Sequence, residues 1–356
     1  MACYSIAVIP GDGVGPEVIP AAQNVLLEAG VKFGFQLRFE EFDWGSGHYF
    51  RHGSMAPPDF IEMLRPFDAI LLGAVGHPAI PDHVTLEGLL LPIRRAFDQY
   101  ATVRPAVLYR GVEGPLKGRG PGEIDLVIVR ENTEGEYAPV GGFLYQHHAE
   151  EIAVQTAVFT RRGCERVIRY AFQLAVRRNG KRCVTSVTKS NAQAYGMVLW
   201  DRVFRAVAAE FPEIRTESLL VDAAAMHFVR RPETFDVVVA SNLFGDILSD
   251  LAAAVTGSIG LAPSANLDPE RRYPSMFEPV HGSAPDIAGR GVANPLAAIL
   301  SGAMMLEHLG EAPAAQAVEQ AVASVLAEGR VRTPDLGGTS ATGEVAAAVV
   351  QRLGAS

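Results

Sequence analysis

Two aspartates, Asp246 and Asp250, lie four residues apart in the otherwise uncharged segment SNLFGDILSDLA (241–252). This spacing places both carboxylates on one face of a helix. An isolated pair of this kind usually reflects the helix dipole and a solvated side chain, but the apolar neighbours here leave little room for a solvated face. A third aspartate, Asp222, ends the predicted strand ESLLVD (217–222). Three carboxylates without His or Cys suit a hard cation, Mg²⁺ or Mn²⁺.

Three arginines could accompany such a cation. Arg94 lies in the helical segment LLLPIRRAF, Arg104 in TVRP, and Arg130 near the end of the apolar strand IDLVIVREN. A single Arg is most often a surface charge, and we expect this of Arg95. Guanidinium groups bind carboxylates through two hydrogen bonds. Arginines beside a divalent cation would therefore suit a small substrate with several carboxylates.

A tyrosine and a lysine also follow predicted strands. Tyr137 stands in VRENTEGEY and Lys189 in SVTKSN. A lone Tyr or Lys is usually structural or solvated. A Lys just past an apolar strand can be partly desolvated, which lowers its pKa and makes it a usable base.

The glycine loop PGDGVGPE (10–17) has the spacing G-x-G-x-G at Gly11, Gly13 and Gly15. The dinucleotide-binding fingerprint of a Rossmann fold is G-x-G-x-x-G, so that interpretation fails and the acids at 40–41 are not ribose ligands. The loop is either a tight turn between a strand and a helix or a ligand loop of another kind.

The composition excludes several classes of protein. The 356 residues include 31 Lys and Arg against 40 Asp and Glu, a formal charge of −9, which argues against a general nucleic-acid binder. Three widely spaced cysteines suggest neither a disulfide framework nor a zinc site. No signal peptide or membrane span is evident, so we expect a soluble, cytoplasmic protein without a membrane partner.

Short β-branched segments alternate with segments of helical periodicity, which predicts an α/β fold with a largely parallel sheet. The predicted strands are 5–10, 68–75, 124–132, 183–190, 217–222 and 236–242. Ligands of open α/β sheets collect beyond the carboxyl ends of the strands, where most of the residues named above lie.

Six segments occur in an order that resembles a known family: PGDGVGPE, FDQYATVRP, VRENTEGEY, VTKSN, FDVVVASNLFGDILSDLA and FEPVHGSAPDIAGRGVANP. From about residue 5 to about residue 345, the chain resembles the β-decarboxylating dehydrogenases, which include isocitrate, 3-isopropylmalate and D-malate/tartrate dehydrogenases. The resemblance implies an isopropylmalate-dehydrogenase-like α/β fold of two domains with central mixed sheets, distinct from a Rossmann fold. The cofactor-side domain would be discontinuous, 1–99 plus 256–356, and 100–255 would carry the metal, the substrate and the dimer contacts.

The resemblance also assigns roles. Asp246 and Asp250 would bind Mg²⁺ or Mn²⁺ together with Asp222 of the other subunit, so a homodimer with shared active sites is implied. The substrate carboxylates would be held by Arg94, Arg104 and Arg130. The catalytic residues would be Tyr137, Lys189 and Asp222, with Lys189 also crossing the dimer interface. The NAD site would be formed by Gly11, Gly13, Gly15, Asn191, His281, Gly282, Ala284, Asp286 and Asn294.

The implied reaction is oxidative decarboxylation with NAD. The metal and Lys189 would lower the pKa of the C2 hydroxyl, hydride would leave C2, the 2-oxo acid would lose CO₂, and Tyr137 would protonate the enolate. Asp286 occupies the position at which NAD enzymes carry an acid and NADP enzymes a Lys. An acid there would accept hydrogen bonds from ribose hydroxyls and repel a 2′-phosphate.

The resemblance implies that the substrate is a small (2R)-hydroxy dicarboxylate. Segments that differ between branches of the family indicate which one. FDQY, FTRRG, PDH and PSANLDPER resemble the D-malate/tartrate branch, which we favour. Glu87, Leu90 and Leu91 resemble 3-isopropylmalate dehydrogenase, and their 3–4 spacing predicts that they share a helical face with Arg94. A non-catalytic regulatory subunit is the remaining alternative, disfavoured because every metal and acid/base residue is present.

Overall fold

The computed structural model describes residues 1–355 and divides the chain into two compact units. The first contains 1–99, 104–124 and the chain from Ala252 onward, and the second contains 100–103 and 125–251. The predicted boundaries had assigned residues 104–124 and 252–255 to the second domain, 100–255, whereas the structure includes them in the first unit. The loop within 104–124 packs on the first unit, where Arg332 Nη2 donates to the Gly111 carbonyl over 2.6 Å.

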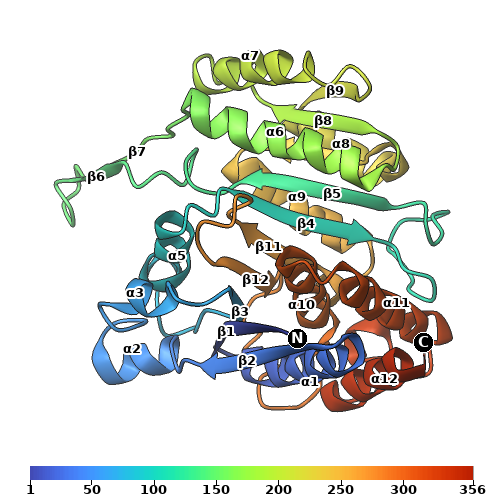
Figure 1. Cartoon of the computed structure of the whole chain (residues 1–356). Coiled ribbons are helices and arrows are strands. Elements are labelled where there is room, and N and C mark those ends of the chain that lie inside the picture. The colour runs from blue at the N-terminus through green and yellow to red at the C-terminus, as the bar shows by residue number, and fades with distance from the viewer. Residues whose placement is uncertain (356) are drawn as a thin grey trace. The chain divides into compact units, whose positions relative to one another are not determined.

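The first unit contains a mixed sheet (Figure 1) with the order β2-β1-β3-β12-β11. β1 pairs with β2 and β3, and β3 with β12, in parallel, whereas β11 and β12 are antiparallel. The strands are β1 (Ala2–Gly11), β2 (Phe35–Glu41), β3 (Ala69–Ala74), β11 (Pro263–Leu267) and β12 (Ser275–Pro279). β4 (Ala101–Val107) is divided between the two units.

Four long helices of the first unit pack against one another: α1 (Gly15–Phe33), α10 (Leu296–Leu309), α11 (Ala312–Glu328) and α12 (Thr342–Ala355). α10 is buried almost all round, which explains its continuous apolar sequence. The shorter helices are α2 (Ser46–His52), α3 (Phe60–Leu64), α4 (Asp82–Thr85), the π-helical turn η1 (Leu86–Leu90) and α5 (Leu91–Ala96).

The second unit contains a parallel sheet with the order β5-β10-β8-β9. Its strands are β5 (Asp125–Glu131), β10 (Val237–Ala240), β8 (Cys183–Thr188) and β9 (Arg215–Leu220). β10 and β8 are fully buried, as expected of strands covered on both faces. The helices are α6 (Arg161–Arg178), α7 (Gly196–Ala208), α8 (Val221–Arg230) and α9 (Asn242–Val255).

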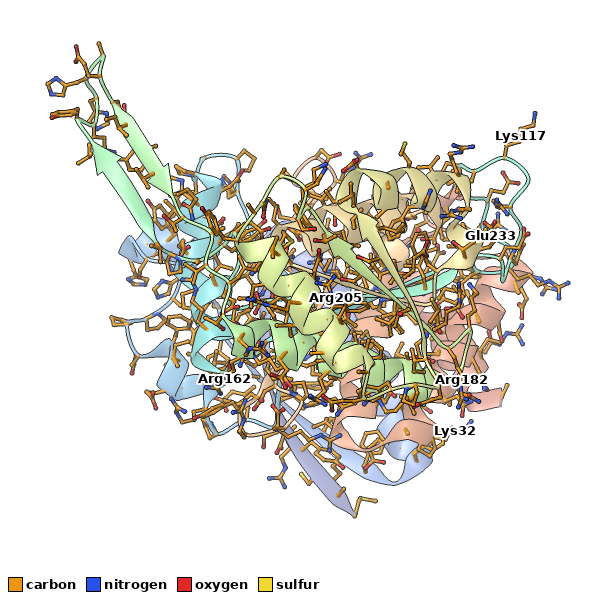
Figure 2. The ribbon with its side chains drawn as sticks, turned by 90° about the horizontal axis from the view of Figure 1, so that it is seen from above. Lys32, Lys117, Arg162, Arg182, Arg205 and Glu233 are labelled. Atoms are coloured by element: carbon orange, nitrogen blue, oxygen red, sulfur yellow. The ribbon has the colours of Figure 1, made fainter. Side chains whose placement is uncertain are left out.

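An antiparallel hairpin also belongs to the second unit and extends away from α6 and α7 (Figures 1 and 2). It is formed by β6 (Gly141–Leu144) and β7 (Ile152–Gln155), all of whose residues are exposed. Phe143 and Leu144 are 61% and 58% exposed. An isolated two-stranded hairpin is marginally stable in water, and this one presents apolar side chains to solvent.

The predicted α/β class, mixed sheet and six strands agree with the structure, but two local expectations were wrong. β9 ends at Leu220, so Asp222 lies in the first turn of α8 and not at the end of a strand. β10 ends at Ala240 and Asn242 already begins α9, whereas the predicted strand 236–242 had included Asn242. Among residues 1–355, no helix combines the length and apolar character needed to cross a lipid bilayer.

Candidate active site

The first turns of α9 meet the end of β5 and the segment that follows it. Asp246 Oδ1 accepts a hydrogen bond from Arg130 Nη1, and its Oδ2 accepts one from the Tyr137 hydroxyl over 2.8 Å. The Arg130 guanidinium also lies 5.2 Å from the centroid of the Tyr137 ring. The structure therefore brings together a predicted metal ligand, a predicted substrate-binding arginine and the predicted acid.

Two polar residues that the sequence reasoning missed connect these elements. Asn242 Oδ1 accepts from Arg130, and Glu136 accepts from the Ser241 hydroxyl and the Leu243 backbone N–H. Both stand in segments whose order suggested the family, VRENTEGEY and SNLFGD, and that placement was the only signal available for them.

Lys189 and Asp222 form a second group within the same unit. Lys189 follows β8, and its ammonium donates to Asp222 Oδ1. This hydrogen bond lowers the pKa of the Asp222 carboxyl. Both side chains are open to solvent, 29% and 59% exposed.

Two of the three metal ligands predicted from the sequence lie on α9. Asp246 and Asp250 lie one turn apart on α9, and the Asp246 side chain is 33% exposed. Two accessible carboxylates fit a hard divalent cation. Within residues 1–355 of one chain, no three His, Cys, Asp or Glu residues converge as a metal site. A third protein ligand would therefore have to come from elsewhere, as the resemblance implies for Asp222.

The other two predicted substrate arginines lie in the first unit. Arg94 is buried, and its Nη2 donates to buried Glu278 over 2.8 Å. Glu278 also accepts from Asn266 Nδ2 over 2.7 Å. The buried Nε of Arg94 has no hydrogen-bond partner. Arg104, in β4, donates from Nε to the Ser264 hydroxyl over 3.3 Å. The ion pair fixes the Nη2 group of the Arg94 guanidinium.

The helix before Arg94 departs from the predicted geometry. Leu91 N donates to Leu86 O, a π-helical bond, so the 3–4 spacing assumed for this helix does not hold. Leu90 belongs to the hydrophobic core of the first unit, and Leu91 is also buried. Glu87 forms two hydrogen bonds with Arg95, of 3.0 and 3.3 Å. Arg95, which we had expected to be a surface charge, is partly exposed and paired with Glu87.

The glycine loop packs on the segment after β12. Val14 N donates to Ser283 O over 2.8 Å, and a Cβ at Gly13 would lie 1.8 Å from the same oxygen. Only glycine permits this approach, and its φ of +58° is also in the left-handed region. Asp12 anchors the loop by accepting from the Ser46 and Gly76 backbone N–H groups. Two of the predicted cofactor segments are thus neighbours.

Two buried atoms beside this loop lack hydrogen-bond partners. They are Nε2 of His281 and Oε2 of Glu17, whose other oxygen accepts from Gly289 N. Burial lowers the pKa of the His281 imidazole. Unsatisfied buried polar atoms are rare in folded proteins, so these two fit a bound polar group such as a dinucleotide.

The remaining predicted cofactor residues lie in the first unit, except for Asn191. Asp286 and Gly282 are exposed, and Ala284 has a left-handed φ of 41°. Asn294 Nδ2 donates to Asp335 Oδ2 over 2.9 Å. Asn191 is exposed in the second unit, and the others lie in the first.

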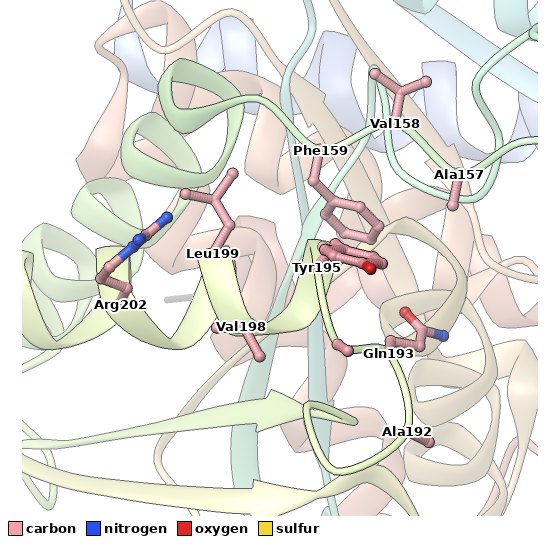
Figure 3. Close-up of a pocket in the computed structure, with 11 residues that line it drawn as sticks. Ala157, Val158, Phe159, Ala192, Gln193, Tyr195, Val198, Leu199 and Arg202 are labelled. Atoms are coloured by element: carbon pink, nitrogen blue, oxygen red, sulfur yellow. The ribbon is translucent and has the colours of Figure 1, made fainter.

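The second unit also contains an open pocket of about 930 Å³ (Figure 3). Its lining is mostly apolar and includes Phe159, Val198 and Leu199, together with Tyr195, which is 91% exposed. No carboxylate lines the pocket, so it is not where a cation would bind.

Comparisons with known proteins complete the description. A family model described as isocitrate/isopropylmalate dehydrogenase matches residues 5–349. The chain is 52% identical over 354 residues to a probable tartrate dehydrogenase/decarboxylase of Agrobacterium vitis, covering 99% of this chain and 98% of that protein. It is 51% identical over 356 residues to the D-malate dehydrogenase (decarboxylating) of Escherichia coli (strain K12), covering 98% of each.

A solved structure agrees with these sequence relatives. The crystal structure of isocitrate dehydrogenase from Methylococcus capsulatus matches with a TM-score of 0.89 at 39% identity, covering 98% of this chain and 99% of that one. The family resemblance predicted from the motifs is confirmed. The chain belongs to the isocitrate/isopropylmalate dehydrogenase family.

Proposed function

We propose that the protein catalyses the NAD-dependent, divalent-metal-dependent oxidative decarboxylation of a small (2R)-hydroxy dicarboxylate, D-malate or tartrate. The observation that carries this proposal is the convergence of Arg130, Tyr137 and Asp246 at the start of α9. The choice of substrate is supported by relatives about half identical over the full length, which are named for D-malate and tartrate.

The residues of this chain would divide the chemistry between them. A divalent cation held by Asp246 and Asp250 would polarise the C2 oxygen. Lys189, which is paired with Asp222 as an ammonium group, would first lose a proton to solvent and would then take the hydroxyl proton as the neutral amine. Tyr137 would deliver a proton to C3 after CO₂ has left. Arg94, Arg104 and Arg130 would hold the substrate carboxylates, each with part of its guanidinium fixed by a protein acceptor.

NAD would bind beside the glycine loop and the segment after β12, which contact each other. His281 Nε2 and Glu17 Oε2 are the buried atoms that such a ligand, or its bound water, would satisfy. Exposed Asp286 would accept hydrogen bonds from the ribose hydroxyls. A 2′-phosphate beside this carboxylate would be repelled, which favours NAD over NADP.

We also propose that the active protein is a homodimer. Among residues 1–355, the side-chain partner of Lys189 is Asp222, and Asp222 does not converge with two further His, Cys, Asp or Glu residues that could complete a metal site. A second copy would bring this pair to Tyr137 and Asp246. The exposed apolar side chains of the β6–β7 hairpin and the pocket lined by Phe159 and Tyr195 are surfaces that such an assembly could bury.

The test is NADH formation by the purified protein with Mn²⁺, NAD⁺ and separate samples of D-malate, tartrate, 3-isopropylmalate and isocitrate. We expect turnover of D-malate or tartrate and its loss on chelation. Asp246→Asn should abolish turnover while the protein stays folded. A folded, metal-loaded protein that turns over none of the four acids would contradict the proposal and favour a non-catalytic subunit.

A further inference from the structure

We infer that Asn242 is a positioning residue that fixes the Arg130 side chain beside Asp246. The inference deepens the proposed function, since it rests on the substrate-binding role proposed for Arg130. Asn242 would not touch substrate, cation or cofactor. It would act through the orientation of one guanidinium group.

The contacts of Asn242 define a clamp. Its Oδ1 accepts from Arg130 Nε over 3.0 Å and from Nη2 over 2.7 Å, so it binds one whole edge of the guanidinium. Its Nδ2 donates to Glu134 O over 3.0 Å. Because the carbonyl must face the donors of Arg130 and the amide must face a backbone carbonyl, this network admits one orientation of the side chain. Both Asn242 and Arg130 are buried.

The stem of the arginine is restricted as well. A Cβ at Gly245 would lie 2.6 Å from Arg130 Cβ and 2.7 Å from its Cγ. These distances are shorter than real carbon contacts, so Gly245 lets the first turn of α9 lie directly against the arginine. The aliphatic part of the Arg130 side chain is restricted by packing against Gly245, and its guanidinium is held by Asn242.

The chemistry of the clamp matters as much as its geometry. Arg130 already donates to the carboxylate of Asp246. An amide oxygen binds the guanidinium without adding a second negative charge, so the Arg130–Asp246 group does not become net negative and does not repel a substrate carboxylate. An aspartate in place of Asn242 would keep the acceptor but leave Arg130, already paired with Asp246, in a group of net negative charge.

The experiment compares Asn242→Ala with Asn179→Gly. Asn179 is a matched control because its Oδ1 also accepts from an arginine Nε, that of Arg182 over 2.9 Å, at the exposed end of α6 in the same unit. Glycine suits the control because Asn179 has a left-handed φ of 49°. Hydrogen bonds to charged groups contribute enough that Asn242→Ala should raise the KM for D-malate about tenfold or more. The KM for NAD⁺ should change less than twofold, and Asn179→Gly should change neither value.

A second measurement does not depend on activity. The ¹⁵N-resolved NMR signal of the Arg130 Nε–H, assigned by its loss in Arg130→Lys, should exchange slowly with water and should broaden or vanish in Asn242→Ala. If this change occurs while the unmutated protein turns over no hydroxy acid, the proposed function fails and the clamp on Arg130 stands. A KM for D-malate within twofold of the unmutated value, or an equal rise in Asn179→Gly, overturns the inference. An unchanged Nε–H signal in Asn242→Ala overturns it as well.

Discussion

Tyr137 donates its phenol hydrogen to Asp246 Oδ2 over 2.8 Å, which joins a candidate acid directly to a candidate metal ligand. The same carboxylate also accepts from Arg130. A carboxylate that shares its charge with a cation is a weaker hydrogen-bond acceptor. Cation binding at Asp246 would therefore loosen its hold on the Tyr137 hydroxyl and leave that proton available for transfer.

Removing the phenol hydroxyl should separate the two halves of the reaction. Tyr137→Phe should reduce kcat for decarboxylation by about 10²–10⁴, the usual contribution of a positioned acid. It should still reduce a supplied 2-oxo acid that needs no decarboxylation, because oxidation at C2 does not use the phenol. Mn²⁺ affinity, measured by titration, controls for damage to Asp246. Unchanged kcat for D-malate would refute the assignment.

Mixing two inactive variants tests the shared active site. Lys189→Met and Asp246→Asn should each be inactive as homodimers. In a mixed dimer, one site would combine the intact Asp246 of one chain with the intact Lys189 of the other. Random reassortment should restore about a quarter of the unmutated activity, since half of the dimers would carry one intact site of two. If no activity returns after subunit exchange has been verified, the two residues act within one chain.

The sequence singles out candidate site residues, but it does not show the contacts that surround them. Asp246, Tyr137 and Arg130 were singled out as candidates because of their residue types and their positions at or after the ends of strands. Asn242 was missed because its function lies in a tertiary contact with Arg130 that no local pattern encodes. Its neighbour Glu136 was missed for the same reason.

The helix before Arg94 shows a second limit. A 3–4 spacing assumes a regular α-helix, but Leu91 N bonds to Leu86 O across a π-helical turn. Pro92 follows at once and has no N–H to donate to the preceding turn, which removes one α-helical bond. The wider turn carries Glu87 toward Arg95, and Leu90 joins the core of the first unit.

Cofactor preference should depend on Asp286. The unmutated protein should have a higher kcat/KM with NAD⁺ than with NADP⁺, because an exposed carboxylate beside the ribose repels a 2′-phosphate. Asp286→Lys should lower the ratio of kcat/KM with NAD⁺ to kcat/KM with NADP⁺. Asp286→Asn should have a ratio between those of the unmutated protein and Asp286→Lys. Steady-state kinetics with both cofactors at fixed D-malate provide the measurement. Equal use of both cofactors by the unmutated protein would show that Asp286 does not face the ribose.

Substrate choice should respond to Glu87. Glu87 resembles the 3-isopropylmalate branch in sequence, but its charged pair with Arg95 is a poor neighbour for an alkyl group, so D-malate should have a higher kcat/KM than 3-isopropylmalate. Glu87→Leu should shift the ratio toward 3-isopropylmalate, by about 10–200-fold if one methylene-sized contact is gained. Arg95→Leu is the matched control, because it breaks the same pair and leaves the carboxylate. A clear preference of the unmutated protein for 3-isopropylmalate would reverse the assignment.

The last prediction concerns stability and His308 in the first unit. Burial, and then the positive charge of Arg271, lower the pKa of His308 from 6.5 to about 4. The folded protein therefore keeps this imidazole neutral below pH 6.5, where the unfolded chain binds a proton. Its contribution to the free energy of unfolding is fully present above pH 6.5 and is lost as the pH falls to about 4. The full loss is up to about 3 kcal/mol.

Urea unfolding between pH 4 and pH 7 measures this contribution. The unmutated protein should lose stability as the pH falls, with part of the slope due to His308. His308→Phe cannot titrate and keeps a ring near Phe277, whose centroid lies 5.6 Å from that of His308. Its stability should therefore depend less on pH over this interval, whatever its value at pH 7. His148→Gln, at an exposed position between β6 and β7, should keep the full slope. Parallel curves for His308→Phe and the unmutated protein would mean that the imidazole binds protons equally in the folded and unfolded states, because only a pKa that differs between the two states produces this slope.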